Sequence, residues 1–335
     1  MTVDQLWGIW NGSIVWRASA GQPAERELPA FPGWSLVLPW ALSPAEMHTE
    51  LLTVFKLPDG EHLVMCRELS LRYRGPELTD DDLLIPSRTA LEILRRLRYL
   101  ARQFDISLRS PAFGTRGENS GGGSIFDGAV DGLRTYSRDY HVPTAITAAH
   151  IDLLANLPCD FVPPIHAEIF LDALQAHADE DPRRALLFAA IAAESCAFEQ
   201  LEEAYERGVA GRDRSLRLVD VPVAGGATVT KDPVYEALRD ADAFKHLLHT
   251  RPLYLLHRSL MVDQPETYRL GRKLYSTRNK LVHYGKVPAE DDYFPITREG
   301  AIEGLETARE IIEWFGDSGP YCVFRGMAAF DGSRL

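Results

Sequence analysis

The sequence has few cysteines and no long uninterrupted apolar run, and both absences narrow the class of protein. Its four cysteines, at positions 66, 159, 196 and 322, include no CxxC pair. A disulfide scaffold or a zinc finger is therefore not expected, and the cysteine content fits a reducing compartment. The most apolar helical stretch, ALLFAAIAAESCAF at 185–198, contains Glu194 and is too short to cross a bilayer.

The first residues, MTVDQLWGIWNGSIVW, also lack a basic segment followed by a long apolar run. We therefore expect no signal peptide, no membrane contact and a cytoplasmic protein. The formal net charge of −12 argues against general adhesion to nucleic acid, because phosphate contacts need cations, but it leaves room for a local basic groove. A length of 335 residues suggests about two domains.

Residues 1–75 are typical of a small antiparallel sheet. Segments 6–18, 33–42, 48–57 and 62–73 are rich in Val, Leu, Trp and Thr, and turn residues at 11–12, 32–33 and 58–60 separate them. The LPDGEH stretch predicts a hairpin. Five tryptophans crowd the first forty residues, and we expect most of them in the core, with stacking on bases or a ligand as the alternative.

A basic helix follows at 87–104. Its polar side carries five arginines, at 88, 95, 96, 98 and 102, against Glu92. Such a charge run predicts a solvated face, and the alternative is a second surface that contacts anions. Residues 110–124, SPAFGTRGENSGGGS, contain no Lys-Ser or Lys-Thr pair after the glycines, so we expect a flexible connector rather than a phosphate loop.

The second half of the chain is predicted to be a bundle of four or five helices. Helical segments are expected at 166–178, 181–208, 232–249, 265–286 and 297–316, with a short strand pair within 209–230 and one strand in the tail. The predicted fold class is thus α+β: a β-rich domain over 1–150, including the basic helix, and an all-α bundle over 151–335.

The segment STRNKLVHYGK at 276–286 is the strongest candidate for a functional site. On a helix, Arg278 and His283 lie about 140° apart with Asn279 between them, while Leu281 and Val282 are expected to face the core. Between residues 271 and 286 there is no acid, and the five cations there would favour a phosphate. Those cations are Arg272, Lys273, Arg278, Lys280 and Lys286.

This segment resembles the signature of the HEPN superfamily, helical bundles with an Arg-x4–6-His motif in which Asn often follows the arginine. Three other pairs, 134/141, 239/246 and 251/257, share the bare spacing, but only 278/283 combines the adjacent Asn279 with a helix stop after His-Tyr-Gly. The run AAIAAESCAFE resembles the first core helix of these families, with Glu194 matching its acid. The likeness to prokaryotic defence-associated members covers residues 165–316 at most.

The resemblance implies a dimeric, metal-independent endoribonuclease without a cofactor, in an antiviral or toxin-like setting. His283 is expected to transfer protons, Arg278 to stabilise phosphoryl charge, and Asn279 to orient His283 or donate to a phosphate. Supporting residues are Glu194, Lys280 and Tyr284. Weaker substrate contacts are expected from Arg272, Lys273 and Lys286. The N-terminal domain is expected to sense an unknown trigger, ligand or partner.

Two other interpretations stay open. The same helices can form a non-catalytic dimerisation or binding module, in which His283 stabilises a helix end and Arg278 pairs with Glu194 or another acid. His246, His249 and His257 are a possible metal group, but no cysteine or well-spaced carboxylate completes the ligand set, so no metal is expected.

Overall fold

The computed structural model describes residues 2–18, 22–41, 51–57, 59–78, 84–104, 106, 112–116, 130–131, 145–222, 228–240, 244 and 246–316. The chain divides into two compact units. The N-terminal unit holds the described residues up to Pro163, and the C-terminal unit holds those from Pro164 to Gly316. We expected the boundary at residue 150, but helix α3 (Ala148–Asn156) packs against helix α2 (Leu84–Ala101) and belongs to the N-terminal unit.

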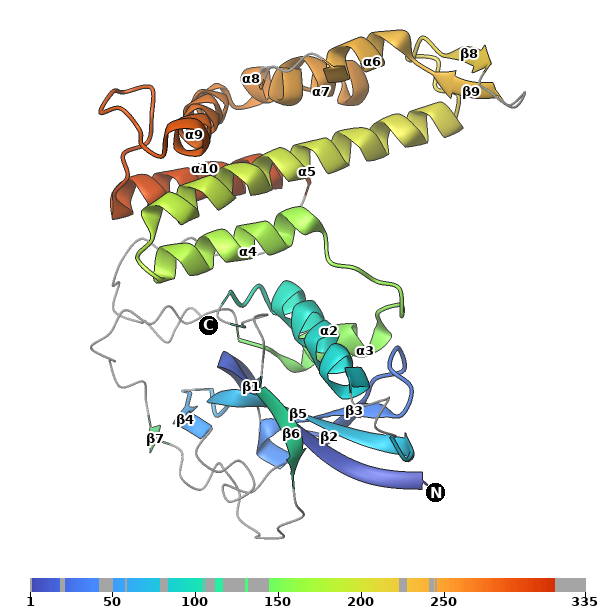
Figure 1. Ribbon diagram of the computed structural model, residues 1–335, viewed down its shortest axis with the longest axis vertical. Helices are drawn as coiled ribbons and strands as arrows, with labels where there is room; N and C mark the ends of the chain where they lie inside the picture. The colour runs from blue at the N-terminus through green and yellow to red at the C-terminus, as the bar shows by residue number, and fades with distance from the viewer. Residues whose placement is uncertain are drawn as a thin grey trace. The chain divides into compact units, whose positions relative to one another are not determined.

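A seven-stranded sheet forms the centre of the N-terminal unit (Figure 1). Its main path runs β2-β3-β5-β1-β6, while β4 pairs with β5 and, in parallel, with β7. A 3₁₀ turn at Pro39–Ala41 follows β3. The strands are Thr2–Ala18 (β1), Glu25–Glu27 (β2), Trp34–Val37 (β3), Leu51–Lys56 (β4), His62–Pro76 (β5), Ala112–Arg116 (β6) and Val130–Asp131 (β7).

Each of the four strand segments expected from the sequence contains a strand, although only Trp34–Val37 of segment 33–42 is extended, and the turn expected at residues 11–12 is wrong. Strand β1 continues through Asn11 and Gly12, and its pairing with β5 shifts register between Trp10 and Ile14. An irregularity of this kind accommodates extra residues within one strand, so the dipeptide marks a bulge and not a hairpin.

The hairpin expected from the LPDGEH stretch is confirmed, and the expected connector at 110–124 is corrected in part. The Leu57 amide donates to the Glu61 carbonyl at 2.7 Å, and Gly60 adopts a φ of 85°, which closes the hairpin between β4 and β5. Strand β6 lies inside the segment 110–124 and pairs antiparallel with β1, so part of that segment is sheet. Residues 117–124 lie outside the described part of the chain.

Helix α2 packs on the sheet through one apolar cluster. Trp7, Trp16 and Trp34 are buried in this cluster, as the sequence predicted for the tryptophans, together with Leu94 and Leu97 of α2. Burial of whole indole rings beneath a helix accounts for much of the apolar surface that such a small unit removes from water. These three indoles are therefore not available to stack on a base.

The basic run at 87–104 is solvated only in part, because Arg88 is exposed and Arg95 partly exposed, while its other three arginines are buried. Arg96 is 1% exposed: its guanidinium donates to the carbonyls of Pro158 and Cys159, both at 2.9 Å, and to Glu92 at 3.0 Å. The Phe31 ring lies 4.9 Å from the same guanidinium. The arginine fork joins α2 to the segment after α3 and satisfies carbonyls that would otherwise be buried without a donor. Arg98, in the same helix, and Arg102, directly after it, are also buried.

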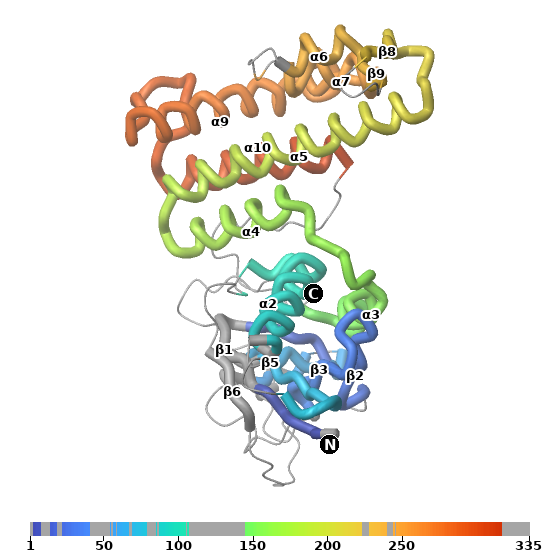
Figure 2. Tube along the Cα trace, turned by 45° about the vertical axis from the view of Figure 1, so that its right-hand side comes forward, coloured from blue at the N-terminus to red at the C-terminus, as the bar shows by residue number. Residues whose placement is uncertain are grey.

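The C-terminal unit is helical apart from one strand pair (Figures 1 and 2). Helices α5 and α10 lie side by side, with α4 on one side of them and α9 on the other, and each of the two central helices contacts both α4 and α9. The strand pair Val219–Pro222 (β8) and Thr228–Lys231 (β9) confirms the expected pair. The helices are Ile165–Ala178 (α4), Pro182–Ala210 (α5), Pro233–Asp240 (α6), Arg251–Leu256 (α7), Leu260–Asp263 (α8), Pro265–Tyr284 (α9) and Arg298–Phe315 (α10).

The longest helix, α5, starts where the sequence predicted and ends later. The Asp181 side chain accepts from the Arg184 amide, which caps the first turn ahead of Pro182. Gly208 does not end the helix but provides space: a Cβ there would lie 2.8 Å from a Leu216 methyl group. The helix continues to Ala210, so its glycine is a packing residue and not a stop.

The segment expected as one helix at 232–249 is broken into pieces. Helix α6 ends at Asp240, a π-helical turn covers His246–Thr250, and α7 starts at Arg251. Pro252 has no amide hydrogen to continue the hydrogen-bond pattern, so the chain starts a new helix there. The mixed α+β class is confirmed, and the predicted tail strand lies outside the described residues. None of the helices described has the length and apolarity needed to cross a membrane.

Candidate functional site

Helix α9 carries the predicted site, and its ends follow from the sequence. Pro265 occupies the first turn, and Gly285 ends the helix in the left-handed conformation with a φ of 65°, its amide donating to the Leu281 carbonyl at 3.0 Å. One face of the helix is packed inside the unit. The residues buried on this face are Thr267, Tyr268, Gly271, Leu274 and Thr277.

His283 lies on the outside of α9. At 100° per residue its position is about 150° from the centre of the buried face, and its side chain is exposed. Its ring contacts that of Tyr284, with 6.3 Å between the centroids. Within the described part of the chain, the imidazole makes no hydrogen bond or ion pair. The imidazole is thus accessible from solvent.

Arg278 faces inward instead, toward helix α5. Its side chain is 28% exposed, and its Nη2 atom lies 3.6 Å from Oε2 of Glu194. Its Nη1 atom donates to Oδ1 of Asn279 at 2.8 Å, and its guanidinium carbon lies 5.8 Å from the Tyr275 ring centroid. The pairing with Glu194 offsets part of its charge, so Arg278 is an anchored cation and not a freely accessible one.

Asn279 contacts the inward arginine and lies, by helical angle, between it and the outward histidine. It precedes His283 by four residues, which places both side chains on neighbouring turns of one face. The Asn279 side-chain oxygen accepts the hydrogen bond from Arg278. The NH₂ group of Asn279 therefore points away from Arg278 and can donate to another molecule. The sequence predicted this order and a separation of about 140°, but it did not predict that Arg278 faces inward while His283 is exposed.

The expectation that Leu281 and Val282 face the core is wrong for Val282. Val282 is 54% exposed, whereas Leu281 is half-buried. The last turn of α9 extends past the elements that cover its earlier turns, so helical phase alone does not decide burial there. An exposed valine beside the polar residues gives this end of the helix an apolar surface.

Three of the other predicted residues meet in one pocket. Lys280, Tyr284 and Lys286 line a cavity of about 400 Å³ together with Val287 and Pro288. The two apolar residues were missed by sequence reasoning, because neither carries a group with chemistry of its own. Of the remaining predicted contacts, Arg272 is exposed, and the Lys273 ammonium lies 4.9 Å from the Phe294 ring centroid.

The segment after α9 is tied back onto the helix. The Thr277 hydroxyl donates to the Lys273 carbonyl at 2.8 Å and accepts from the Phe294 amide at 2.9 Å. Phe294 itself is fully buried. This hydrogen bond ties the segment between α9 and α10 back onto α9, a few residues after the pocket-lining Val287 and Pro288.

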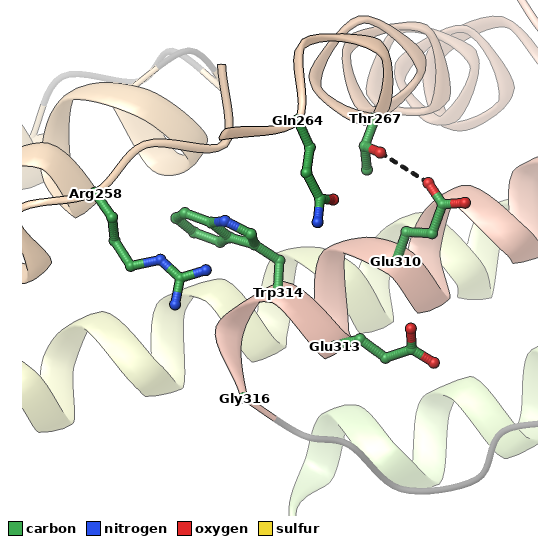
Figure 3. A pocket seen from close by; sticks show the side chains of 7 residues that line it. All are labelled: Arg258, Gln264, Thr267, Glu310, Glu313, Trp314 and Gly316. Atoms are coloured by element: carbon green, nitrogen blue, oxygen red, sulfur yellow. Dashed lines mark hydrogen bonds between the residues drawn. The ribbon is translucent and has the colours of Figure 1, made fainter. Parts of the chain in front are cut away.

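A larger cavity of about 610 Å³ lies at the end of α10 (Figure 3). The Trp314 indole donates to Asp263 at 3.0 Å, and the Arg258 guanidinium stacks 4.1 Å from the Trp314 ring centroid. Among the lining residues, the Thr267 hydroxyl also donates to Glu310 at 2.8 Å, and these contacts favour a structural role. Its lining residues are Arg258, Gln264, Thr267, Glu310, Glu313, Trp314 and Gly316.

A buried polar network occupies the other end of the unit, between α5, α6 and α7. Tyr235 donates to Glu202 at 2.8 Å, and Arg251 donates to both of them, at 2.9 Å to Glu202 and 2.7 Å to Tyr235. Burial raises the pKa of Tyr235 to about 12, although Arg251 opposes the shift. Because Arg251 is 2% exposed, it cannot act with His257 as a second Arg-x-His pair.

Asp232 extends this network. Its carboxylate is fully buried and accepts from the amides of Arg217, Val234 and Tyr235 and from the Tyr254 hydroxyl. Burial raises the pKa of Asp232, but these four donors outweigh burial and hold it below the usual value. Burial and the bond to Asp232 raise the pKa of Tyr254 to about 12.

The histidines proposed as a metal group do not assemble. His249 hydrogen-bonds with the buried Ser259 hydroxyl at 2.6 Å, and His257 is exposed in a left-handed conformation. In the described ranges no three His, Cys, Asp or Glu side chains cluster closely enough to hold a metal ion. A separate pair, His166 with Glu199 at 2.6 Å, joins α4 to α5; sequence reasoning missed it because the partners are far apart in the chain.

No family model, curated protein or solved structure matches this chain. The interpretation of the site therefore depends on its own geometry. Chemically, the end of α9 offers an accessible imidazole, an amide donor held by an anchored arginine, and a pocket with two lysines. That combination suits proton transfer next to a bound anion.

Proposed function

We propose that this protein is a metal-independent endoribonuclease of the HEPN type, with Arg278, Asn279 and His283 as its site. The observation that carries the proposal is the chain of contacts from Glu194 through Arg278 to Asn279, with the unpaired, exposed imidazole of His283 four residues further along. A purely structural helix end has no need for an anchored amide beside an accessible histidine.

In the proposed reaction, His283 removes the proton from a ribose 2′-hydroxyl. The 2′-oxygen attacks the adjacent phosphorus, and the bond from phosphorus to the 5′-oxygen breaks. The products are a 2′,3′-cyclic phosphate and a 5′-hydroxyl, whose proton comes from an imidazolium or from water. Asn279 donates to a phosphoryl oxygen, and the Arg278 charge behind it stabilises the extra negative charge of the transition state.

We propose that the active form is a homodimer in which two α9 ends face each other. The exposed side chains of Val282 and Tyr284, which are 54% and 67% exposed, give this end an apolar surface for a second copy or a substrate. Two copies would also bring two sets of cations to one cleft. The proposed setting is antiviral defence or a toxin-like response in the cytoplasm, with the N-terminal unit sensing a trigger.

The test is RNA cleavage in the presence of a chelator. Wild-type protein is expected to cleave RNA, and His283→Ala is expected to lose at least about a hundredfold in rate, the usual contribution of a positioned proton-transfer group. His257→Asn is the matched control, because it removes an exposed histidine from the same unit and asparagine tolerates the left-handed backbone there. Equal cleavage by all three proteins, or cleavage only with added metal, would contradict the proposal.

The ion pair of Arg278 with Glu194 favours a second candidate, a non-catalytic dimerisation or binding module with a ligand- or protein-sensing N-terminal unit. In that case Arg278 stabilises the contact between α9 and α5 and has no substrate. Arg278→Lys discriminates the two, because it keeps the charge near Glu194 but loses the guanidinium that holds Asn279. Loss of cleavage with unchanged stability supports the enzyme, whereas no cleavage by wild type, together with a loss of stability in Arg278→Lys, supports the module.

A further inference from the structure

The Tyr284 side chain, at the end of α9, is largely exposed to solvent. It is 67% exposed, and it forms one wall of the 400 Å³ pocket described above. That volume falls within the range of sites for small molecules, about 300–1,000 Å³. An aromatic face kept in water beside a pocket is suited to a flat, apolar ligand group.

The backbone around this pocket is held by a helix end and a hydrogen bond. Gly285 reverses the chain after α9, and the hydrogen bond from the Phe294 amide to Thr277 holds the returning segment in place. Val287 and Pro288 then stand opposite the end of the helix as an apolar wall. Proline at this position restricts the backbone, which fixes the width of the pocket.

The charged lining of the pocket is basic. Lys280 and Lys286 line it, and the Lys280 ammonium lies 5.1 Å from the centroid of the Tyr284 ring. None of the residues that line it is acidic, although three acids follow at 290–292. A stacking surface flanked by two cations matches a nucleobase attached to its phosphates.

We infer that this pocket binds one unpaired nucleobase of a single-stranded RNA, stacked on Tyr284, with Lys280 and Lys286 contacting the flanking phosphates. The inference rests on the proposed function and extends it. Only 6.3 Å separates the ring centroids of His283 and Tyr284, so the stacked nucleotide places its own ribose and phosphate beside the imidazole. A base inside a duplex cannot reach the pocket, because its faces are already stacked.

The experiment measures binding separately from cleavage. A short fluorescent oligonucleotide made entirely of 2′-deoxynucleotides cannot be cleaved by attack of a 2′-hydroxyl, so its anisotropy reports affinity alone. Tyr284→Ala is expected to weaken binding about tenfold, in the range for one stacked base. Tyr284→Trp, which restores an aromatic face, is expected to recover the loss. Val262→Ala is the control, because that side chain is equally exposed at 67% and lies elsewhere.

A second arm removes the base instead of the tyrosine. Wild type is expected to bind an oligonucleotide with abasic positions about tenfold more weakly than it binds the intact strand. Tyr284→Ala is expected to bind the abasic and the intact strands with equal affinity. If Tyr284→Ala binds within twofold of wild type, or if wild type binds no single strand, the base site is refuted. Base binding without RNA cleavage would refute the endoribonuclease and leave the base site standing.

Discussion

Replacing Asp232 by asparagine tests whether the buried network between α5, α6 and α7 holds the C-terminal unit together. The carboxylate accepts two donors on Oδ1, from Val234 and Tyr235, and two on Oδ2, from Arg217 and Tyr254. Asparagine keeps the shape and one accepting oxygen. Its NH₂ group, however, would face two donors, so two hydrogen bonds to a charged acceptor are lost.

The expected cost follows from those two bonds. A hydrogen bond to a charged group contributes about 1.5–3 kcal/mol, and the Arg217 amide is left without an acceptor, so Asp232→Asn should destabilise the unit by about 3–5 kcal/mol. Tyr254→Phe removes a single donor and should cost about 1.5–3 kcal/mol. In the double variant the tyrosine hydroxyl no longer opposes the amide, so the two costs should not add.

The assay follows the unfolding of the C-terminal unit through its own tryptophan. Trp314 is the sixth tryptophan, and the other five stand at positions 7, 10, 16, 34 and 40. Fluorine NMR of protein labelled with 5-fluorotryptophan, with the Trp314 resonance assigned from Trp314→Phe, gives a denaturation curve for this unit alone. The resonances of the N-terminal tryptophans serve as the internal control.

The effect also has a predicted pH dependence. The folded pKa of Asp232 lies below its ordinary value of 3.8, so the carboxylate adds stability above that value and loses it as the pH falls through the lowered pKa. The difference between wild type and Asp232→Asn should therefore be full at neutral pH and shrink below about pH 4. A Trp314 curve that changes by less than about 0.5 kcal/mol at neutral pH would refute the reasoning.

Two further predictions concern the packing of each unit. Arg96→Lys should destabilise the N-terminal unit by about 2–4 kcal/mol in denaturant unfolding, because lysine cannot donate to the Pro158 and Cys159 carbonyls together. The control is Arg95→Lys, one residue away and partly exposed, which should change the stability by less than about 0.5 kcal/mol. Gly300→Ala should lower the stability of the C-terminal unit by more than about 2 kcal/mol, because its Cβ would lie 2.2 Å from the Pro295 carbonyl oxygen; a midpoint equal to wild type would contradict this steric account.

Local patterns predicted most of the elements, because strands and helices depend on nearby residues. Alternation and turns located the strands, and Asp181, Pro182 and Gly285 marked helix ends that the structure confirms. The π-helical turn at His246–Thr250, inside the helix expected at 232–249, was missed, and so was helix α7. Each of these features is determined by residues close together in the chain, and sequence patterns predict such local features well.

Long-range contacts account for what the sequence did not predict. The arginine run of α2 looked like a solvated face, but Arg96 is buried by carbonyls more than sixty residues away. Likewise, the inward direction of Arg278 depends on Glu194 in another helix. The pocket beside Tyr284 needed Val287 and Pro288, which carry no chemical signal, and a fixed position set by Thr277 and Phe294.

The most direct test of the proposed chemistry uses a DNA oligonucleotide with one ribonucleotide, incubated with the protein in excess chelator. We predict a single cut on the 3′ side of that ribonucleotide, leaving a 2′,3′-cyclic phosphate, and no cut by His283→Ala. Cleavage at deoxynucleotides, products with a 3′-hydroxyl end, or an equal cut by the variant would contradict the assignment of His283.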